Sequence, residues 1–197
     1  MKSARYKEFV KKSILAGILI GLGGFSNLRA KDATIGAVMF SIGLISVILL
    51  KCNLYTGKVG YARRITKIPA LSAMCLLNIL GAGLLGAATS PVISEAAFAT
   101  MDKKLNRPLI YVFITSAVCG ALIYLAVELF KIYRSIILII LPVFTFVATG
   151  ADHCIANAYY LSAGKMFSIK ALVYMLVCIL GNAVGSLIIS LMQVKPE

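Results

Sequence analysis

The fold of this chain is constrained most by six long apolar segments that fill most of its 197 residues. About 20 apolar residues in a helix are needed to cross the hydrocarbon core of a bilayer. The third, fourth and sixth segments have that length, and 60% of all residues are hydrophobic. The sequence therefore predicts an all-α integral membrane protein with six transmembrane helices in one domain, residues 1–197. The segments are 12–28, 33–50, 70–90, 109–130, 135–149 with a continuation beyond it, and 171–192.

Charged residues lie between the apolar segments, so the net charge of +13 indicates membrane orientation rather than a surface for nucleic acid. With the N-terminus inside, twelve Lys and Arg residues, among them Arg63 and Lys195, would be cytoplasmic and seven would be external. We expect a multi-pass protein of the cell (inner or plasma) membrane with both termini cytoplasmic. The linkers are short, and the longest is expected at residues 91–108.

Two of the segments are broken in matching places. The second runs into the polar stretch 51–57 and the fifth into 150–153, and both stretches contain glycine. Because three spans is an odd number, two copies of a three-helix unit must be inverted, and broken helices in inverted halves point to a transport site. We place the halves at about 10–90 and 105–193. Three pairs of matching residues support these halves, because the members of each pair are separated by nearly the same number of positions. The pairs are Gly17 and Gly120 (103 positions), Asn78 and Asn182 (104), and Gly81 and Gly185 (104).

The second break holds the only histidine of the chain, His153, beside the carboxylate of Asp152. An ionisable group at membrane depth is a candidate for function. A broken helix also exposes backbone N–H groups, which together with the helix dipole attract anions. If the two breaks face each other, the Thr56 hydroxyl and a His153 N–H can both donate hydrogen bonds to an anion between them.

Large apolar side chains precede both breaks and predict narrow, dewetted constrictions: Phe40 and Leu44 before the first, Phe144 and Phe146 before the second. A bare anion crossing such rings meets a large desolvation cost. A weak acid that has taken up a proton crosses as a neutral molecule. Histidine exchanges protons near neutral pH, so His153 could supply that proton or hold the anion while it arrives.

These motifs resemble the formate–nitrite transporter family, pentameric channels whose protomer is similar to an aquaporin. The resemblance covers nearly the whole chain, and its most specific part is the pattern Gly-x-acid-His-x-x-Ala-Asn at residues 150–157. It implies six helices with a broken second and fifth. The matching stretches are 16–24, 54–57, 78–82, 142–157 and 181–185.

The resemblance also implies the roles of single residues. His153 is then the central histidine and Thr56 the loop threonine facing it, in a substrate and proton site that includes Asp152 and Asn157. Lys104, favoured over its neighbour Lys103, matches a lysine that draws anions into the outer vestibule. The implied constriction residues are Phe40, Leu44, Leu54 and Phe146. The implied partners are a small weak-acid anion, protons, the lipid bilayer and four further copies in a homopentamer, without nucleic acid.

Three positions in this sequence depart from the family pattern. The usual Gly-Ala-(Glu/Asp) before the first loop is Lys51-Cys52-Asn53, and the asparagine usual in the fourth span is Gly120. The glutamate usual before the histidine is the shorter Asp152. We expect Lys51 to favour anions further. We expect the missing amide at Gly120 to leave space or an extra water near the histidine. These departures bear on which anion is carried.

The leading hypothesis is a channel or transporter for anions such as formate, nitrite, hydrosulfide, acetate or lactate. Within transport, the alternative is a channel for small neutral solutes of aquaporin-like character. From a different class, a membrane enzyme could use Asp152, His153 and Cys154, since Cys–His pairs can activate a nucleophile. Adjacent residues on a helix usually point in different directions, so we expect no enzyme. The five cysteines form no CxxC pair, so we also expect no metal and no cofactor.

Overall fold

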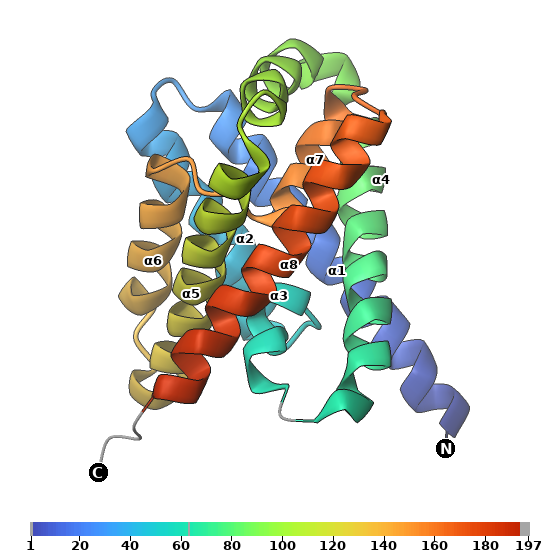
Figure 1. The fold of residues 1–197 in the computed structure, drawn as a ribbon, viewed down its shortest axis with the longest axis vertical. Coiled ribbons are helices and arrows are strands. Elements are labelled where there is room, and N and C mark those ends of the chain that lie inside the picture. Colours follow the sequence, from blue (N-terminus) through green and yellow to red (C-terminus); the bar gives the residue numbers. More distant parts are fainter. Residues whose placement is uncertain (1, 63, 194–197) are drawn as a thin grey trace.

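A computed structural model describes residues 2–62 and 64–193 of the chain. Arg63 and Lys195, which entered the orientation count, lie outside the described residues, as do the ends of the range 1–197. The described part is all-helical (Figure 1). Its helices are α1 (Lys2–Arg29), α2 (Ala33–Leu49), α3 (Tyr55–Lys58), η1 (Val59–Tyr61), η2 (Ile65–Lys67), α4 (Ile68–Leu105), α5 (Leu109–Tyr133), α6 (Ile137–Ala148), α7 (Cys154–Ala163) and α8 (Ile169–Met192).

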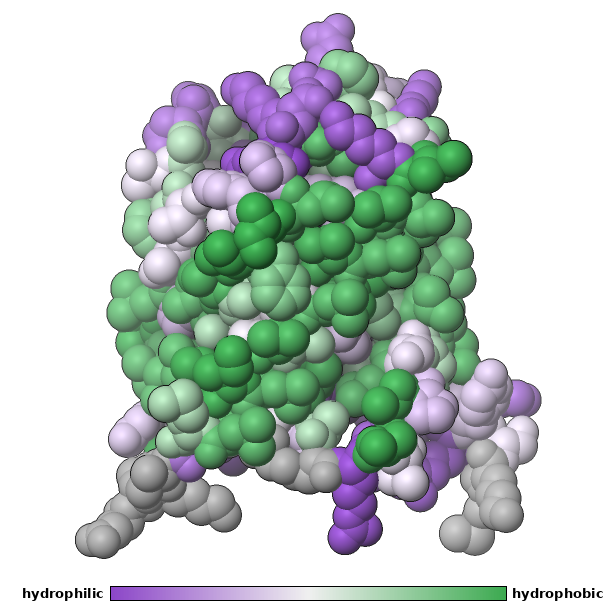
Figure 2. Space-filling view, viewed as in Figure 1, coloured by the Kyte–Doolittle hydropathy of each residue, from purple (hydrophilic) through white to green (hydrophobic). Residues whose placement is uncertain are grey.

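Helix length and surface polarity identify a multi-pass membrane protein. Four helices, α1, α4, α5 and α8, are long and apolar enough to cross a bilayer, while α2 and α6 are shorter apolar helices. A broad apolar band crosses the face of the molecule seen in Figure 2, with hydrophilic residues at both ends. Helix α1 begins and helix α8 ends at the same end of the bundle (Figure 1).

The prediction of a linker at residues 91–108 was wrong for most of that range. Helix α4 continues through Pro91 and ends only at Leu105, and its last part turns across the end of the bundle (Figure 1). Buried residues hold this extension at every fourth position: Ile93, Ala97 and Met101. Proline removes one N–H donor and bends a helix, but this buried face is sufficient to keep the segment helical.

The two broken helices end in the same way. After α2, the Cys52 N–H donates to the Val47 carbonyl (2.9 Å) and Lys51 has a positive φ of 52°. After α6, the Ala151 N–H donates to the Phe146 carbonyl (2.9 Å) and Gly150 has a φ of 67°. Both are Schellman-type ends, in which a left-handed residue stops the helix. Glycine adopts this conformation freely, whereas Lys51 does so at a steric cost.

Two asparagines hold the chain just after these ends, and we call them the asparagine clamps. The Asn78 amide accepts from the Tyr55 N–H (2.8 Å) and donates to the carbonyls of Asn53 (2.8 Å) and Ser13 (2.7 Å). Each clamp supplies hydrogen-bond partners to backbone N–H and C=O groups that a broken helix leaves unpaired.

The second clamp repeats these contacts. The Asn182 amide accepts from the Cys154 N–H (2.9 Å) and donates to the carbonyls of Asp152 and Ser116 (2.8 Å each). Each clamp therefore joins one break to two long helices, α4 and α1 in the first case and α8 and α5 in the second.

Glycines bring those long helices into backbone contact. A Cβ atom at Gly17 would lie 2.0 Å from the Asn78 carbonyl oxygen, and one at Gly120 would lie 2.0 Å from the Asn182 carbonyl oxygen. The expectation that Gly120 leaves space or a water near the histidine was therefore wrong. Gly120 lies within α5 against the α8 backbone, where a small residue is needed for close helix packing.

Candidate functional site

The imidazole of His153 lies between the two breaks and is fixed by both ring nitrogens. His153 is the N-cap residue of α7, and its Nδ1 accepts the Ala156 N–H at 3.1 Å. Its Nε2 lies 2.9 Å from the hydroxyl oxygen of Thr56, on α3. Because Nδ1 accepts, a neutral ring carries its proton on Nε2 and donates it to Thr56. His153 is 1% exposed and Thr56 is 0% exposed, so this contact is closed to bulk water.

Aromatic rings form an apolar collar beside the histidine. Phe146 stacks on the His153 ring with centroids 5.7 Å apart and planes at 22°. Phe40 meets Phe146 edge-on, with centroids 5.4 Å apart. Both phenylalanines are buried. Phe40 and Phe146 therefore lie together, although they come from different broken helices. The third aromatic residue expected at a constriction, Phe144, is half-buried and takes no part in these ring contacts.

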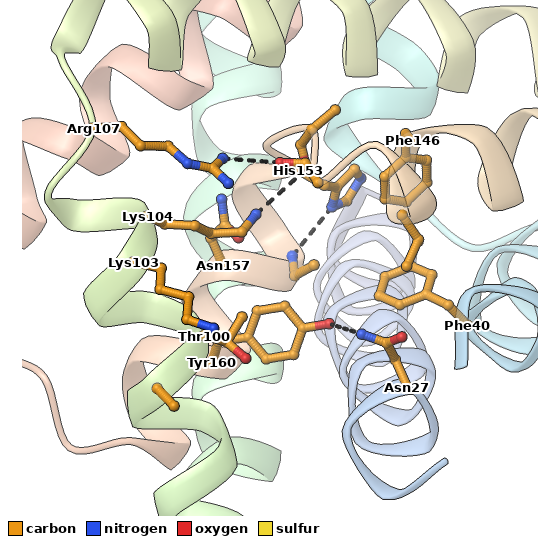
Figure 3. A pocket seen from close by; sticks show the side chains of 15 residues that line it. Asn27, Phe40, Thr100, Lys103, Lys104, Arg107, Phe146, His153, Asn157 and Tyr160 are labelled. Atoms are coloured by element: carbon orange, nitrogen blue, oxygen red, sulfur yellow. Dashed lines mark hydrogen bonds between the residues drawn. The ribbon is translucent and has the colours of Figure 1, made fainter. Parts of the chain in front are cut away.

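A cavity of about 260 Å³ opens on one side of this collar, and we call it the histidine cavity (Figure 3). His153, Phe40 and Phe146 line its deep part. The lining also contains three cationic side chains, Lys103, Lys104 and Arg107, and no carboxylate. It therefore favours anions over cations and over neutral solutes.

A second cavity of about 270 Å³ lies on the other side, and we call it the leucine cavity because Leu44 and Leu54 line it. Leu54 is the N-cap residue of α3 and is 2% exposed. It holds the same place in the first break as His153 does in the second. The leucine cavity is also cationic and its lining lacks a carboxylate; its charged residues are Lys51, Lys58, Lys131 and Arg134.

Lys104 was expected to draw anions into the outer vestibule, but its ammonium group is bound to neighbouring residues and does not extend freely into the histidine cavity. Its Nζ donates to Asp152 Oδ1 (2.8 Å), Asn157 Oδ1 (3.2 Å) and the Ala151 carbonyl (3.4 Å). The residue is 8% exposed. Figure 3 shows the side chain reaching from α4 toward the chain segment that carries His153. The more exposed cation of this cavity is Lys103.

Asp152 is fully buried and satisfied by several donors besides Lys104. Tyr174 donates to Oδ1 (2.6 Å), Thr115 donates to Oδ2 (2.7 Å), and Arg107 lies 3.6 Å from Oδ2. A buried carboxylate needs such paired and hydrogen-bonded surroundings. Sequence reasoning missed Thr115 and Tyr174. The available signal was weak, because isolated hydroxyl groups are common in apolar helices and do not reveal their partners.

The other expected site residues have separate places. Lys51 lines the leucine cavity. Asn53 lines neither cavity; its side-chain oxygen accepts from Lys58 Nζ at 2.5 Å. Asn157 lines the histidine cavity and donates to the Tyr174 hydroxyl (2.7 Å).

The side chains of Asp152 and His153 bind different partners. Both His153 ring nitrogens hydrogen-bond Ala156 and Thr56, and the Asp152 carboxylate accepts from Lys104, Tyr174 and Thr115. Within residues 2–62 and 64–193, His, Cys, Asp and Glu form no group of three or more that could hold a metal ion.

Comparisons with known proteins agree with this geometry. A family model described as "Formate/nitrite transporter" matches residues 2–194. The solved structure "Pentameric formate channel with formate bound" is similar with a TM-score of 0.80 and 23% identity, over 98% of this chain and 96% of that chain. The structure "FNT family ion channel" has a TM-score of 0.81 and 18% identity, over 95% of this chain and 88% of that chain. No curated protein matches the chain.

Proposed function

Because this chain belongs to the formate/nitrite transporter family, we propose that it conducts small monovalent anions of weak acids across the membrane with a proton transferred at His153. The candidate substrates are formate, nitrite, hydrosulfide, acetate and lactate. One similar solved structure has formate bound, which supports this class. The observation that carries the proposal is the buried contact between His153 Nε2 and Thr56 Oγ1 (2.9 Å), placed between two cationic cavities.

The first step is accumulation of the anion. Both cavities are lined by cations and lack carboxylates, so each raises the local concentration of anions at its mouth. This charge favours an anion pathway over the alternative of a neutral-solute channel, because a neutral molecule gains nothing from it. Lys103 and Arg107 act in this way at the histidine cavity, and Lys51 acts at the leucine cavity.

The second step is neutralisation at the collar. The side chains around this point are apolar, so they cannot replace the water that hydrates an anion. They are Phe40 and Phe146 on one side and Leu44 and Leu54 on the other. An anion that reaches the contact between His153 and Thr56 can accept a hydrogen bond from the Thr56 hydroxyl. It can also accept one from the Nε2–H of His153 once that N–H turns from Thr56 to the anion. Once it has also bound a proton, it crosses the apolar rings as an uncharged acid.

The capping bond of His153 supports one of two proton routes. If the ring itself supplied the proton, it would first become an imidazolium with N–H groups at both nitrogens. In the present structure the Ala156 N–H donates to Nδ1, with the two nitrogens 3.1 Å apart. A proton on Nδ1 would place two donors against each other, and the capping bond would be lost. We therefore assign His153 the role of holding the anion while the proton arrives through water in the cavity.

The same proposal extends to the architecture. The two asparagine clamps, the two Schellman-type ends and the two glycine contacts recur in residues about 10–90 and about 105–193. We take these ranges as inverted three-helix repeats, with both termini cytoplasmic and an aquaporin-like pathway between the halves. One similar structure is pentameric, and we propose a homopentamer for this chain.

The test is uptake of the five candidate anions into proteoliposomes across a fixed pH gradient. We expect His153→Ala to abolish most proton-linked uptake, while His153→Asn, which keeps an N–H donor, retains a measurable part. Equal loss in both variants would support proton supply by the ring instead. Unchanged uptake in His153→Ala would refute a role of the histidine in transport.

A further inference from the structure

A third cavity lies at the end of the bundle where α1 begins and α8 ends, and we call it the Tyr61 cavity. It has a volume of about 430 Å³ and is enclosed by α3 and η1, by the first turns of α4, and by α5. It lies beside the leucine cavity and shares Gly57, Lys58, Val127 and Lys131 with it. A Cβ atom at Gly57 would lie 3.4 Å from Val127, so these two shared residues lie close to each other.

The rim of the Tyr61 cavity is cationic. Three lysines line it, Lys58, Lys67 and Lys131, together with Tyr61. Lys131 Nζ lies 3.6 Å from the centre of the Tyr61 ring and 3.5 Å from Glu128 Oε2. That carboxylate offsets one positive charge. The cavity therefore keeps a positive surplus, which suits a group with one or two negative charges.

Lys67 is the cation with the greatest freedom to bind a ligand. Lys58 donates to Asn53 and Lys131 is engaged by Tyr61 and Glu128. The backbone N–H of Lys67 donates to the Arg64 carbonyl (3.0 Å). Within the described part of the chain, its ammonium group has no hydrogen bond or ion pair, and the residue is exposed. A phosphate oxygen is a ready acceptor for such an ammonium group.

The rest of the cavity is apolar. Leu71, Met74 and Val127 line it beside the lysines. Two isoleucines next to it are strongly exposed, Ile65 at 83% and Ile68 at 54%. Exposed isoleucine beside lysine is typical of the boundary between hydrocarbon and headgroups. A soluble phosphate could use only the lysines, whereas a phospholipid could use both parts.

We propose that the Tyr61 cavity binds the phosphate headgroup of an anionic phospholipid, with Lys67 as its principal ligand and the Leu71–Met74 face against the acyl chain. Basic pockets between membrane helices recognise such headgroups, and each nearby Lys contributes about 1 kcal/mol, or about fivefold in affinity. A bound lipid would brace η1 and the start of α4 beside the leucine cavity.

The experiment measures lipid retention on the intact purified protein by native mass spectrometry, with phosphatidylglycerol and phosphatidylcholine titrated separately. We expect phosphatidylglycerol to bind the wild type more tightly than phosphatidylcholine, and Lys67→Ala to weaken the first about fivefold. Lys31→Ala, which removes an exposed charge from the α1–α2 connection at the other end of the bundle, is the matched control and should resemble the wild type.

Three results would overturn the proposal. One is equal binding of the two lipids to the wild type, which needs no variant to be folded. Another is equal retention of phosphatidylglycerol by Lys67→Ala and Lys31→Ala. A third is full displacement of the lipid by millimolar inorganic phosphate, which would assign the site to a soluble anion. Lipid retention is measured without any flux, so its failure leaves the proposed transport function untouched.

Discussion

The Nε2 atom of His153 and the hydroxyl oxygen of Thr56 lie 2.9 Å apart, although the residues are separated by 97 positions in the chain. The contact joins the segments that follow the two broken helices, beside the apolar collar of Phe40 and Phe146. It also fixes the direction of the only imidazole in the protein. The chemistry proposed for the pathway depends on this one hydrogen bond.

Thr56→Val keeps the shape of the threonine and removes its hydroxyl. We expect proton-linked anion uptake to fall about ten- to hundredfold, because the variant loses a buried hydrogen bond and one donor to the anion. Thr56→Ser should keep most of the uptake. The measurement is initial uptake rate in proteoliposomes. Equal rates for Thr56→Val and the wild type would exclude the hydroxyl from the pathway.

Asp152→Asn removes the carboxylate that neutralises Lys104. We expect a loss of about 3–5 kcal/mol in stability, because a buried ammonium is left without its ion-pair partner. The measurement is thermal unfolding in detergent. The double variant Lys104→Met with Asp152→Asn should recover part of this loss. A single variant as stable as the wild type would refute a stabilising role of the Lys104–Asp152 ion pair.

Lys103→Ala should lower uptake at low anion concentration more than at saturation, because Lys103 is the exposed cation of the histidine cavity and acts by attraction over distance. High salt should erase the difference from the wild type. Lys104→Ala should instead lower the unfolding temperature, since Lys104 is paired with Asp152. An equal loss of uptake at both anion concentrations in Lys103→Ala would argue against steering.

Lys51→Gly should stabilise the protein by about 1 kcal/mol, because Lys51 adopts a left-handed φ of 52° at the end of α2. The matched change, Gly150→Ala, should destabilise it by a similar amount, since Gly150 has a φ of 67° at the end of α6. Unfolding temperatures of the two variants provide the comparison. No gain in Lys51→Gly would show that other contacts of the lysine offset the strain.

Much of this arrangement could be predicted from the sequence because the signals were local. The breaks after α2 and α6 were visible as polar, glycine-containing stretches. The opposing positions of Thr56 and His153 were expected from the proposed repeat and from the family resemblance. The helix through Pro91 was missed because a proline was given more weight than the spacing of Ile93, Ala97 and Met101. Those three residues follow a helical period that could have been recognised.

The pairing of Lys104 with Asp152 could not be predicted in the same way. It joins residues 48 positions apart and depends on how far the end of α4 extends. The place of Gly120 was equally hidden, because the sequence alone does not distinguish a glycine that opens a space from one that lets two backbones touch. Only the contact with Asn182 decides between these possibilities.

The asparagine clamps also limit how this protein can move while it works. Each clamp ties a break to two long helices of its own half by three hydrogen bonds. The Thr56–His153 hydrogen bond joins the two halves, so tilting one half against the other would break that bond. Rotation of Phe40 or Phe146 breaks none of these bonds and belongs to a far faster class of motion than domain rocking. We therefore expect side-chain motion, rather than alternating access, to limit the rate of transport. The flux should then resemble that of a channel more than that of a carrier.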